Sequence, residues 1–278
     1  MTIHNDQIEE ILFAFRTGES VPNICRQYSI GKTKAYELLN RVKLESVSTI
    51  DTDESCKDHK SVVGIIGDTH FPFVRDGYMD FCYDIFKREG VTEIVHIGDI
   101  VDNHNWSRHD SEPDAVSGLN EFEEALECVR EMSYTFSDWP ITLVLGNHDL
   151  IPKTQLKKLG LPDLLLKSFE DLFKVPHWNV CTSAVIDNVE YSHGINCTAT
   201  LLTAQRKRRS CVFGHSHSKA DIQFHASWDD RVFGMHVGCG FDDKSYAARY
   251  GKESHLKSII SCGVVKDGKH PSLHMMDL

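Results

Sequence analysis

The feature that most constrains this chain is a series of short polar motifs, most of which follow a run of apolar residues. Each motif places aspartate, asparagine or histidine next to a glycine. They read Gly-Asp-Thr-His (67–70), Gly-Asp-Ile-Val-Asp (98–102), Gly-Asn-His-Asp (146–149), His-Gly (193–194) and Gly-His-Ser-His (214–217). Carboxylate and amide oxygens, together with imidazole nitrogens, bind divalent transition metals. The motifs therefore predict a catalytic site for two such ions.

Strand-like and helix-like segments alternate around the first three motifs. Apolar runs at 61–66, 93–97 and 141–145 each end at a motif, and helical patterns at 78–89 and 121–134 separate them. Such alternation predicts βαβ units with a parallel sheet. Ligands of open α/β sheets bind beyond the carboxyl ends of the strands. We therefore expect these motifs to meet at one edge of the sheet.

The second half of the chain predicts a mixture of helices and antiparallel strands. A leucine-rich segment at 161–173 predicts a helix or helix pair that covers the sheet, and 180–193 predicts a hairpin that turns at Asp187 and Asn188. The remaining predictions are a helix at 198–209, a strand at 210–213, and antiparallel strands at 231–237, 259–265 and 270–276.

The N-terminal part differs from the rest in pattern and in charge. Residues 6–45 read as three short helices, and the Ser-, Thr- and Asp-rich stretch 46–60 reads as a linker. We therefore expect a small all-α domain at 1–45, the linker at 46–60 and an α/β domain at 61–278. Residues 1–45 carry six acidic and six basic side chains, whereas the whole chain has a net charge of −11. The negative net charge of the whole chain argues against a protein that binds nucleic acid over its whole surface.

The small N-terminal domain resembles the helix-turn-helix of resolvase-like and transposase-like proteins. The matching residues are Ile24, Cys25, Ile30, Gly31, Lys34, Tyr36 and Leu39. The resemblance implies a recognition helix at 32–43, whose first turn (Lys32, Thr33 and Lys34) would contact DNA in the major groove. A three-helix bundle that serves dimerisation or protein docking is the alternative.

The five motifs, in this order between about residues 61 and 240, resemble those of the calcineurin-like metallophosphoesterase superfamily. The resemblance implies an αββα sandwich of two sheets. It also implies one metal ion bound by Asp68, His70 and His217 and a second bound by Asn147, His193 and His215. Asp99 would bridge both ions. Mn²⁺ is favoured for this mixed ligand set, and Fe, Zn²⁺ or Ni²⁺ satisfy the same ligands.

Two further residues match catalytic positions of the family. His148 resembles the histidine that faces the leaving oxygen and is assigned general-acid or charge-stabilising work. Asp102 is expected to orient His148 or raise its pKa. Protein phosphatases of the superfamily have an arginine after this aspartate, where this chain has Asn103. We therefore expect Asn103, His104 or Arg108 to contact the substrate phosphate.

These features predict a metal-dependent phosphoesterase that hydrolyses phosphodiester bonds by attack of a metal-bridging hydroxide. The missing arginine and the helix-turn-helix-like segment favour nucleic acid, and DNA in particular, as the substrate. A phosphomonoesterase for nucleotides or phosphoproteins, with a docking N-terminal domain, is the second hypothesis. A DNA-binding regulator without catalysis is the third.

The bulk composition indicates a cytoplasmic protein without a membrane span. No stretch approaches the roughly 18 continuous apolar residues that a membrane-spanning helix needs, and the N-terminus lacks the pattern of a secretory signal. The nine cysteines form no C-x-x-C pair and are expected to be reduced. The oligomeric state is left open by the sequence.

Overall fold

The computed structural model describes residues 5–16, 21–31, 35, 38, 61–106, 117–194, 199–245 and 257–277. The chain divides into two compact units, Met1–Asp58 and His59–Leu278. No helix among the described residues is long and apolar enough to cross a membrane. The described cysteines, seven in number, are all free thiols.

The first unit contains helices α1 (Asn5–Arg16) and α2 (Val21–Tyr28). Apolar side chains at helical spacing are buried between them, among them Ile11 and Ile24. Ala35 and Leu38 are also helical and buried. They are the described residues of the predicted recognition helix at 32–43. Lys32, Thr33 and Lys34, like the predicted linker at 46–60, lie outside the described residues, so the helix-turn-helix stays a prediction.

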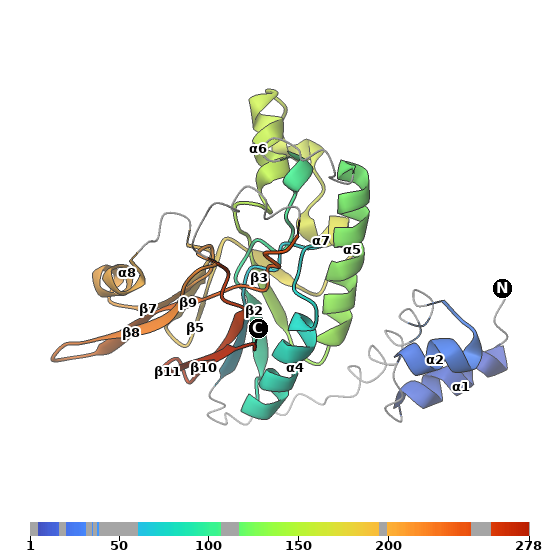
Figure 1. Ribbon diagram of the computed structural model, residues 1–278, viewed down its shortest axis with the longest axis horizontal. Coiled ribbons are helices and arrows are strands. Elements are labelled where there is room, and N and C mark those ends of the chain that lie inside the picture. Colours follow the sequence, from blue (N-terminus) through green and yellow to red (C-terminus); the bar gives the residue numbers. More distant parts are fainter. Residues whose placement is uncertain are drawn as a thin grey trace. The chain divides into compact units, whose positions relative to one another are not determined.

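The second unit contains two sheets, as the sequence predicts. The first sheet has the strand order β11-β10-β1-β2-β3-β4 (Figure 1). Its strands are β1 (Val62–Ile66), β2 (Glu93–His96), β3 (Ile141–Val144), β4 (Asn179–Cys181), β10 (Ser261–Lys266) and β11 (His270–Met275). The strands β1 to β4 are parallel to one another, whereas β10 pairs antiparallel with both β1 and β11.

The second sheet has the order β5-β6-β7-β9-β8. Its strands are β5 (Ser183–Ile186), β6 (Val189–Ser192), β7 (Ser210–Phe213), β8 (Ala220–Ala226) and β9 (Arg231–Val237). Strands β6, β7 and β9 are parallel, and β5 and β8 close the two edges antiparallel. The turn between β5 and β6 is at Asp187 and Asn188, as predicted.

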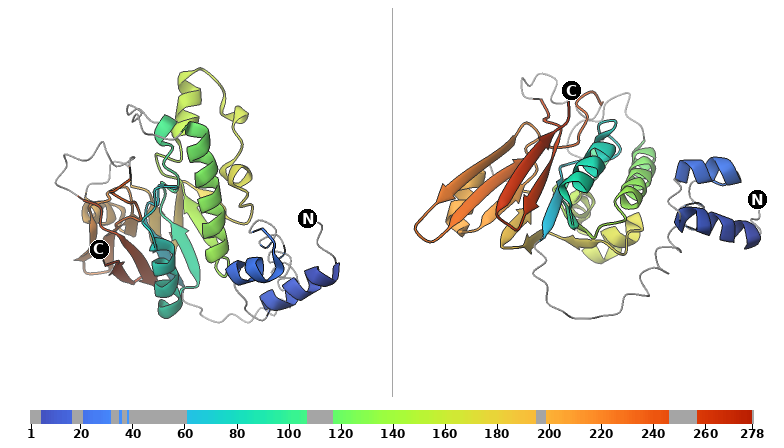
Figure 2. Two further views of the ribbon diagram at one scale, coloured as in Figure 1. Left: turned by 45° about the vertical axis from the view of Figure 1, so that its right-hand side comes forward. Right: turned by 90° about the horizontal axis from the view of Figure 1, so that it is seen from below.

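The two sheets lie face to face (Figure 2), with apolar side chains packed between them. One cluster lies between the sheets and joins residues such as Ile65 of β1 to Tyr191 of β6 and Met235 of β9. A second cluster lies between the first sheet and the helices α4 (Tyr78–Glu89) and α5 (Gly118–Thr135). On the outer face of the second sheet, Ala204 of α8 (Thr200–Lys207) packs on Phe213. The layer order is therefore helix, sheet, sheet, helix.

Two segments differ from the sequence prediction. The leucine-rich segment 161–173 forms only a 3-10 turn (Asp163–Leu165) and the short helix α7 (Phe169–Phe173). Leu164 and Leu165 are exposed, and Ser168 is the N-cap residue of α7. Strand β8 was not expected, because its half-exposed edge position removes the regular apolar alternation. The helix α6 (Ile151–Lys158) follows the third motif directly.

Candidate metal centre

The predicted metal ligands all follow strand ends. Asp68 and His70 follow β1, Asp99 follows β2, and Asn147 follows β3, all in the first sheet. His193 directly follows β6, and His215 and His217 follow β7 in the second sheet. Because the strands within each set are parallel, their carboxyl ends lie at one edge, and the two facing sheets bring both sets of loops together.

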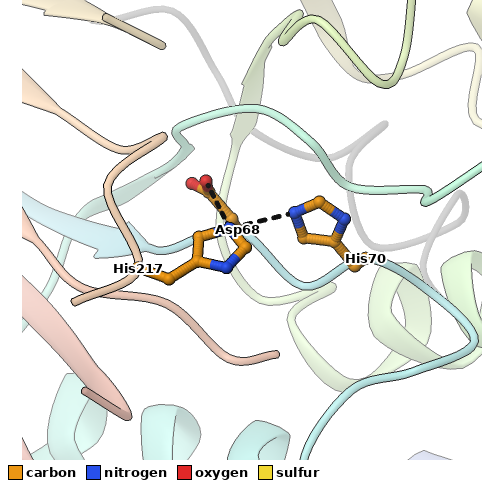
Figure 3. Close-up of side chains that lie close together, drawn as sticks. All are labelled: Asp68, His70 and His217. Atoms are coloured by element: carbon orange, nitrogen blue, oxygen red, sulfur yellow. Dashed lines mark hydrogen bonds and ion pairs between the residues drawn. The ribbon is translucent and has the colours of Figure 1, made fainter. Parts of the chain in front are cut away.

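The first group of candidate ligands is Asp68, His70 and His217. Nε2 of His217 lies 3.3 Å from Oδ2 of Asp68 and 3.1 Å from Nε2 of His70. Figure 3 shows these three side chains converging, with His217 facing both of its partners. Asp68 and His70 are buried, so the group opens to solvent on the side of His217.

The second group is Asp99, His193 and His215, joined by the amide of Asn147. Nε2 of His193 lies 3.1 Å from Oδ2 of Asp99, 3.0 Å from Oδ1 of Asn147 and 3.2 Å from Nδ1 of His215. The ligand atoms of each group lie within 4.8 Å of one another. Both groups thus have the donor types and the spacing of a site for one cation.

Asp99 lies between the two groups. Its Oδ2 atom is 3.1 Å from Nε2 of His193 in the second group and 3.8 Å from Nε2 of His70 in the first. Its Oδ1 atom accepts a hydrogen bond of 2.7 Å from the backbone N–H of His148. One carboxylate therefore faces both groups, which is the position that a bridging ligand requires.

Several buried atoms of the site fit a cation and are not satisfied by the protein. Oδ1 of Asp68 is buried and has no hydrogen-bond partner among the described residues. Imidazole nitrogens face each other at 3.1 Å in one group and at 3.2 Å in the other. Glycine is needed beside these carboxylates, because a Cβ atom at Gly146 would collide with Asp99 and one at Gly214 with Asp68. The donor set therefore fits divalent metal ions.

The charges of the site shift the pKa values of its members. Burial alone would raise the pKa of Asp99, but the hydrogen bond and charge of His193 outweigh it and lower the pKa below its ordinary value. Burial alone would lower the pKa of His193, but the carboxylates of Asp68 and Asp99 raise it to about 9. Without a cation, a proton on His193 thus balances the carboxylates.

His148 lies beside the first group and contacts Asp102. Its Nδ1–H donates to the backbone carbonyl of Asp102 at 2.6 Å, and its ring lies edge-on to that of His70. Burial alone would lower the pKa of His148, but the hydrogen bond and charge of Asp102, with the charge of Asp99, raise it to about 10. The Asp102 carboxylate itself makes its shortest contact, 2.6 Å, with Nδ1 of His70. Asp102 therefore orients both histidines.

The three residues predicted to bind substrate have different surroundings. The amide nitrogen of Asn103 donates to the carbonyl oxygen of His148 at 2.8 Å. His104 is buried, and its Nδ1 lies 3.8 Å from Oδ2 of Asp102. Arg108 lies outside the described residues. The described part of the loop thus holds Asn103 and His104 within contact distance of the His148–Asp102 pair.

Two residues that the sequence analysis did not single out, His96 and Thr69, form hydrogen bonds that hold these loops. His96, buried at the end of β2, accepts from the backbone N–H of Gly98 through Nδ1, and its Nε2 lies 3.1 Å from the hydroxyl of Thr69. Thr69 in turn donates to the carbonyl oxygen of Ile100. This chain of contacts ties the first motif to the second. A histidine within an apolar run was the only signal in the sequence, and such a histidine is typical of an ordinary core residue.

Asp149 and Glu121 hold the backbone of the same loops. Asp149 accepts from the N–H groups of Ile100 and Val101 through Oδ1 and from Gly146 through Oδ2. Glu121 of α5 accepts from the backbone N–H of His104 at 2.6 Å. These two carboxylates satisfy turn N–H groups that the strands leave unpaired.

Four site residues have left-handed backbone conformations. The φ angles are 47° at His70, 48° at Asp99, 52° at Asn103 and 64° at His215. Non-glycine residues in this region cost about 1–3 kcal/mol each, and they persist where the surrounding contacts hold them. The strain turns each side chain from the end of its strand into the common site.

Comparisons with known proteins give one family match and several similar solved structures. The family model described as calcineurin-like phosphoesterase matches residues 61–215. Vacuolar protein sorting 29 from Cryptosporidium parvum has 11% identity and a TM-score of 0.39, covering 80% of this chain and 100% of that one. Yfce, a phosphoesterase from E. coli, has 14% identity and a TM-score of 0.36, covering 73% and 87%. The Pseudomonas putida nuclease MPE has 12% identity and a TM-score of 0.27, covering 77% and 87%.

A search of the curated proteins finds no match. The family match spans the strands β1, β2, β3, β6 and β7 and the motifs at their ends up to His215. Because the family model matches more than half of the chain, the chain belongs to the calcineurin-like phosphoesterase family, whose members hydrolyse phosphate esters with divalent metal ions.

Proposed function

We propose that this chain uses two divalent metal ions to hydrolyse phosphodiester bonds in nucleic acid, with DNA as the substrate. The observation that carries the proposal is the position of Asp99. One carboxylate oxygen faces a histidine of each candidate ligand group, at 3.1 Å and 3.8 Å. Two cations held on either side of a shared carboxylate are the arrangement of two-metal hydrolases.

The residues that would hold the ions are those of the two groups. Asp68, His70 and His217 would hold one ion, Asn147, His193 and His215 the other, and Asp99 both. When bound, such ions activate water as a nucleophile and neutralise the charge of the phosphate. Mn²⁺ is the ion that we favour, because the set mixes carboxylate, amide and imidazole donors.

His148 would stabilise or protonate the leaving oxygen. Its Nδ1–H is bound to the carbonyl oxygen of Asp102, which leaves Nε2 as the ring nitrogen that can reach a substrate. The Asp102 carboxylate lies 3.4 Å from the same ring and favours its protonated form. Protonated His148 can therefore stabilise or protonate the departing oxygen.

Asn103, His104 and Arg108 remain our proposed substrate-binding residues. In place of the arginine that phosphomonoester-cleaving protein phosphatases have here, Asn103 brings no positive charge to the phosphate. A phosphodiester carries less negative charge than a monoester, so a site without that cation suits a diester better. The N-terminal unit, with Lys32, Thr33 and Lys34, would bind the DNA.

The experiment compares three substrates with manganese-loaded protein: bis(p-nitrophenyl) phosphate, p-nitrophenyl phosphate and linear DNA. We expect turnover of the first and third to exceed turnover of the second. The variant His148→Asn should lower kcat by about 10²–10⁴-fold for a diester with a poor leaving group while it retains its metal. Turnover of the monoester alone would reject the diesterase assignment, and unchanged turnover in His148→Asn would reject the role of His148.

A further inference from the structure

A cavity of about 660 Å³ lies beside the metal centre, between the start of α8 and the strands β8 and β9. Its walls include the first turn of α8, the segment 218–221, and the side chains of His236 and Ile259. The volume is that of a pocket for a small organic molecule. None of these residues belongs to the candidate metal ligands.

The cavity adjoins His217 directly. The wall residues Ser218 and Lys219 follow His217 in the chain. Another wall residue, Ile259, donates its backbone N–H to the carbonyl oxygen of His217 at 2.8 Å. The cavity wall therefore includes residues that follow His217 in the chain and one that is hydrogen-bonded to its backbone.

The cavity wall contains one buried side chain, His236, and one buried carboxylate oxygen, Oδ1 of Asp221, without a hydrogen-bond partner among the described residues. His236 has 2% of its surface exposed, and neither ring nitrogen has a hydrogen-bond partner among the described residues. Asp221, directly opposite His236 in the pairing of β8 with β9, has a buried Oδ1 atom that is likewise unpaired in the described part of the chain. Unpaired buried groups cost about 1–3 kcal/mol each, so their place in a cavity wall points to a ligand.

The other wall of the cavity favours an anion. The N-cap residue of α8 is Ala199, and within the described residues no side chain caps this helix end. The N–H groups of the first turn and the positive end of the helix dipole favour a phosphate there. Lys219 adds a positive charge to the same cavity. One ligand would thus carry an anionic group for α8 and hydrogen-bond donors for Asp221.

We propose that this cavity is a subsite for the nucleotide unit that flanks the scissile phosphodiester. A nucleotide combines both requirements, with a phosphate for the α8 end and hydroxyl or amino groups for Asp221 and His236. This proposal rests on the proposed function, because only a nucleic-acid substrate has a further nucleotide next to the phosphodiester that is cleaved. It explains how a site that activates water for small esters would prefer a polynucleotide.

The test is a calorimetric titration of full-length, manganese-loaded protein with deoxyadenosine 5′-monophosphate. Asp221→Ala removes the carboxylate, and Ala199→Phe adds a bulky side chain to the cavity wall. The controls Asp229→Ala and Ala226→Phe make the same changes at exposed positions near the β8–β9 turn. We expect one binding event that both cavity variants weaken by at least about tenfold and both controls retain.

Nucleotide binding that all four variants share equally, or none in the wild type, overturns the subsite. With oligonucleotide as substrate, the ratio of its kcat/KM to that of bis(p-nitrophenyl) phosphate should fall in the cavity variants by the same factor. Because the titration needs no turnover, it tests nucleotide binding in the cavity even if the chain proves to cleave no diester. Tryptophan fluorescence checks the fold of each variant, since all four tryptophans belong to the second unit.

Discussion

At the scale of single residues, Asp99 has the most consequential position. It combines a left-handed backbone, a hydrogen bond to the N–H of His148, and one oxygen that faces both ligand groups. The neighbouring Gly146 leaves space for this carboxylate. Its geometry therefore links the two ligand groups, each of which draws residues from both sheets, through a single side chain.

We predict that Asp99→Asn lowers kcat for bis(p-nitrophenyl) phosphate by at least about a hundredfold, because a shared carboxylate supplies several kcal/mol of stabilisation to a two-metal site. Bound manganese, measured by elemental analysis, should fall from two ions per chain to one or fewer. Asp138→Asn is the matched control, since Asp138 is exposed and pairs only with Lys87 among the described contacts. Full metal content and activity in Asp99→Asn would contradict a bridging role.

A second prediction at this scale concerns pH. Burial would lower the pKa of His193, yet Asp68 and Asp99 raise it to about 9 in the metal-free site, so a bound ion must displace a proton at neutral pH. Manganese affinity should therefore rise by about tenfold per pH unit between pH 6 and 8 and level off above the pKa. Competition with a fluorescent chelator measures this slope. A manganese affinity independent of pH would show that metal binding does not displace a proton from His193.

At the scale of elements, α5 supports the loop of the second motif through Glu121. Its carboxylate accepts from the N–H of His104 at 2.6 Å and from the side-chain amide of Asn105 at 2.5 Å. The loop that carries Asp102 and Asn103 thus depends on a helix that contributes no ligand. Burial raises the pKa of Glu121 above its ordinary value.

We predict that Glu121→Ala destabilises the second unit by about 1–3 kcal/mol, because it leaves buried N–H groups without an acceptor. Glu121→Gln should recover part of this loss, since its amide oxygen still accepts one bond. Urea unfolding followed by tryptophan fluorescence measures the change for this unit alone, because residues 1–58 contain no tryptophan. Equal midpoints for wild type and Glu121→Ala would mean that the loop is held by other contacts.

At the scale of the whole molecule, the chain has two units with different charge. Residues 1–45 are neutral, and the acidic excess lies in the rest of the chain, which includes the carboxylates of the metal site. A cation pair would neutralise part of that excess, but the second unit still offers no general attraction to DNA. Binding of long DNA would therefore depend on the N-terminal unit.

Deletion of residues 1–45 should leave the hydrolysis of bis(p-nitrophenyl) phosphate unchanged and weaken DNA binding by at least about tenfold in low salt. Fluorescence anisotropy with a labelled duplex measures the second effect. A shortened chain that binds DNA like the full chain would favour the alternative role of this unit, docking of a protein partner.

Much of the second unit follows from the sequence because its signals are local. Apolar runs that end at Gly-Asp or Gly-Asn predict β1, β2 and β3 and the loops after them, and the structure has them there. The leucine-rich segment 161–173 was predicted as a helix or helix pair over the sheet, but only its second half, α7, packs against the cluster on the first sheet. Its leucines have helical spacing, but Leu164 and Leu165 find no sheet surface to cover and stay exposed. Local helix propensity favours a helix here, but whether a helix forms depends on its packing against the rest of the protein.

By itself, the sequence determined the fold family and the set of donors at the strand ends, because both depend on short runs of neighbouring residues. Only the tertiary structure decided which donors meet. His70 faces His217 across 147 positions of sequence, and the carboxylate of Asp102 contacts His70 more closely than His148. Unpaired His236 lies opposite Asp221 through the register of two strands. Such pairings depend on sheet register and on strained turns, which are set by contacts between distant segments.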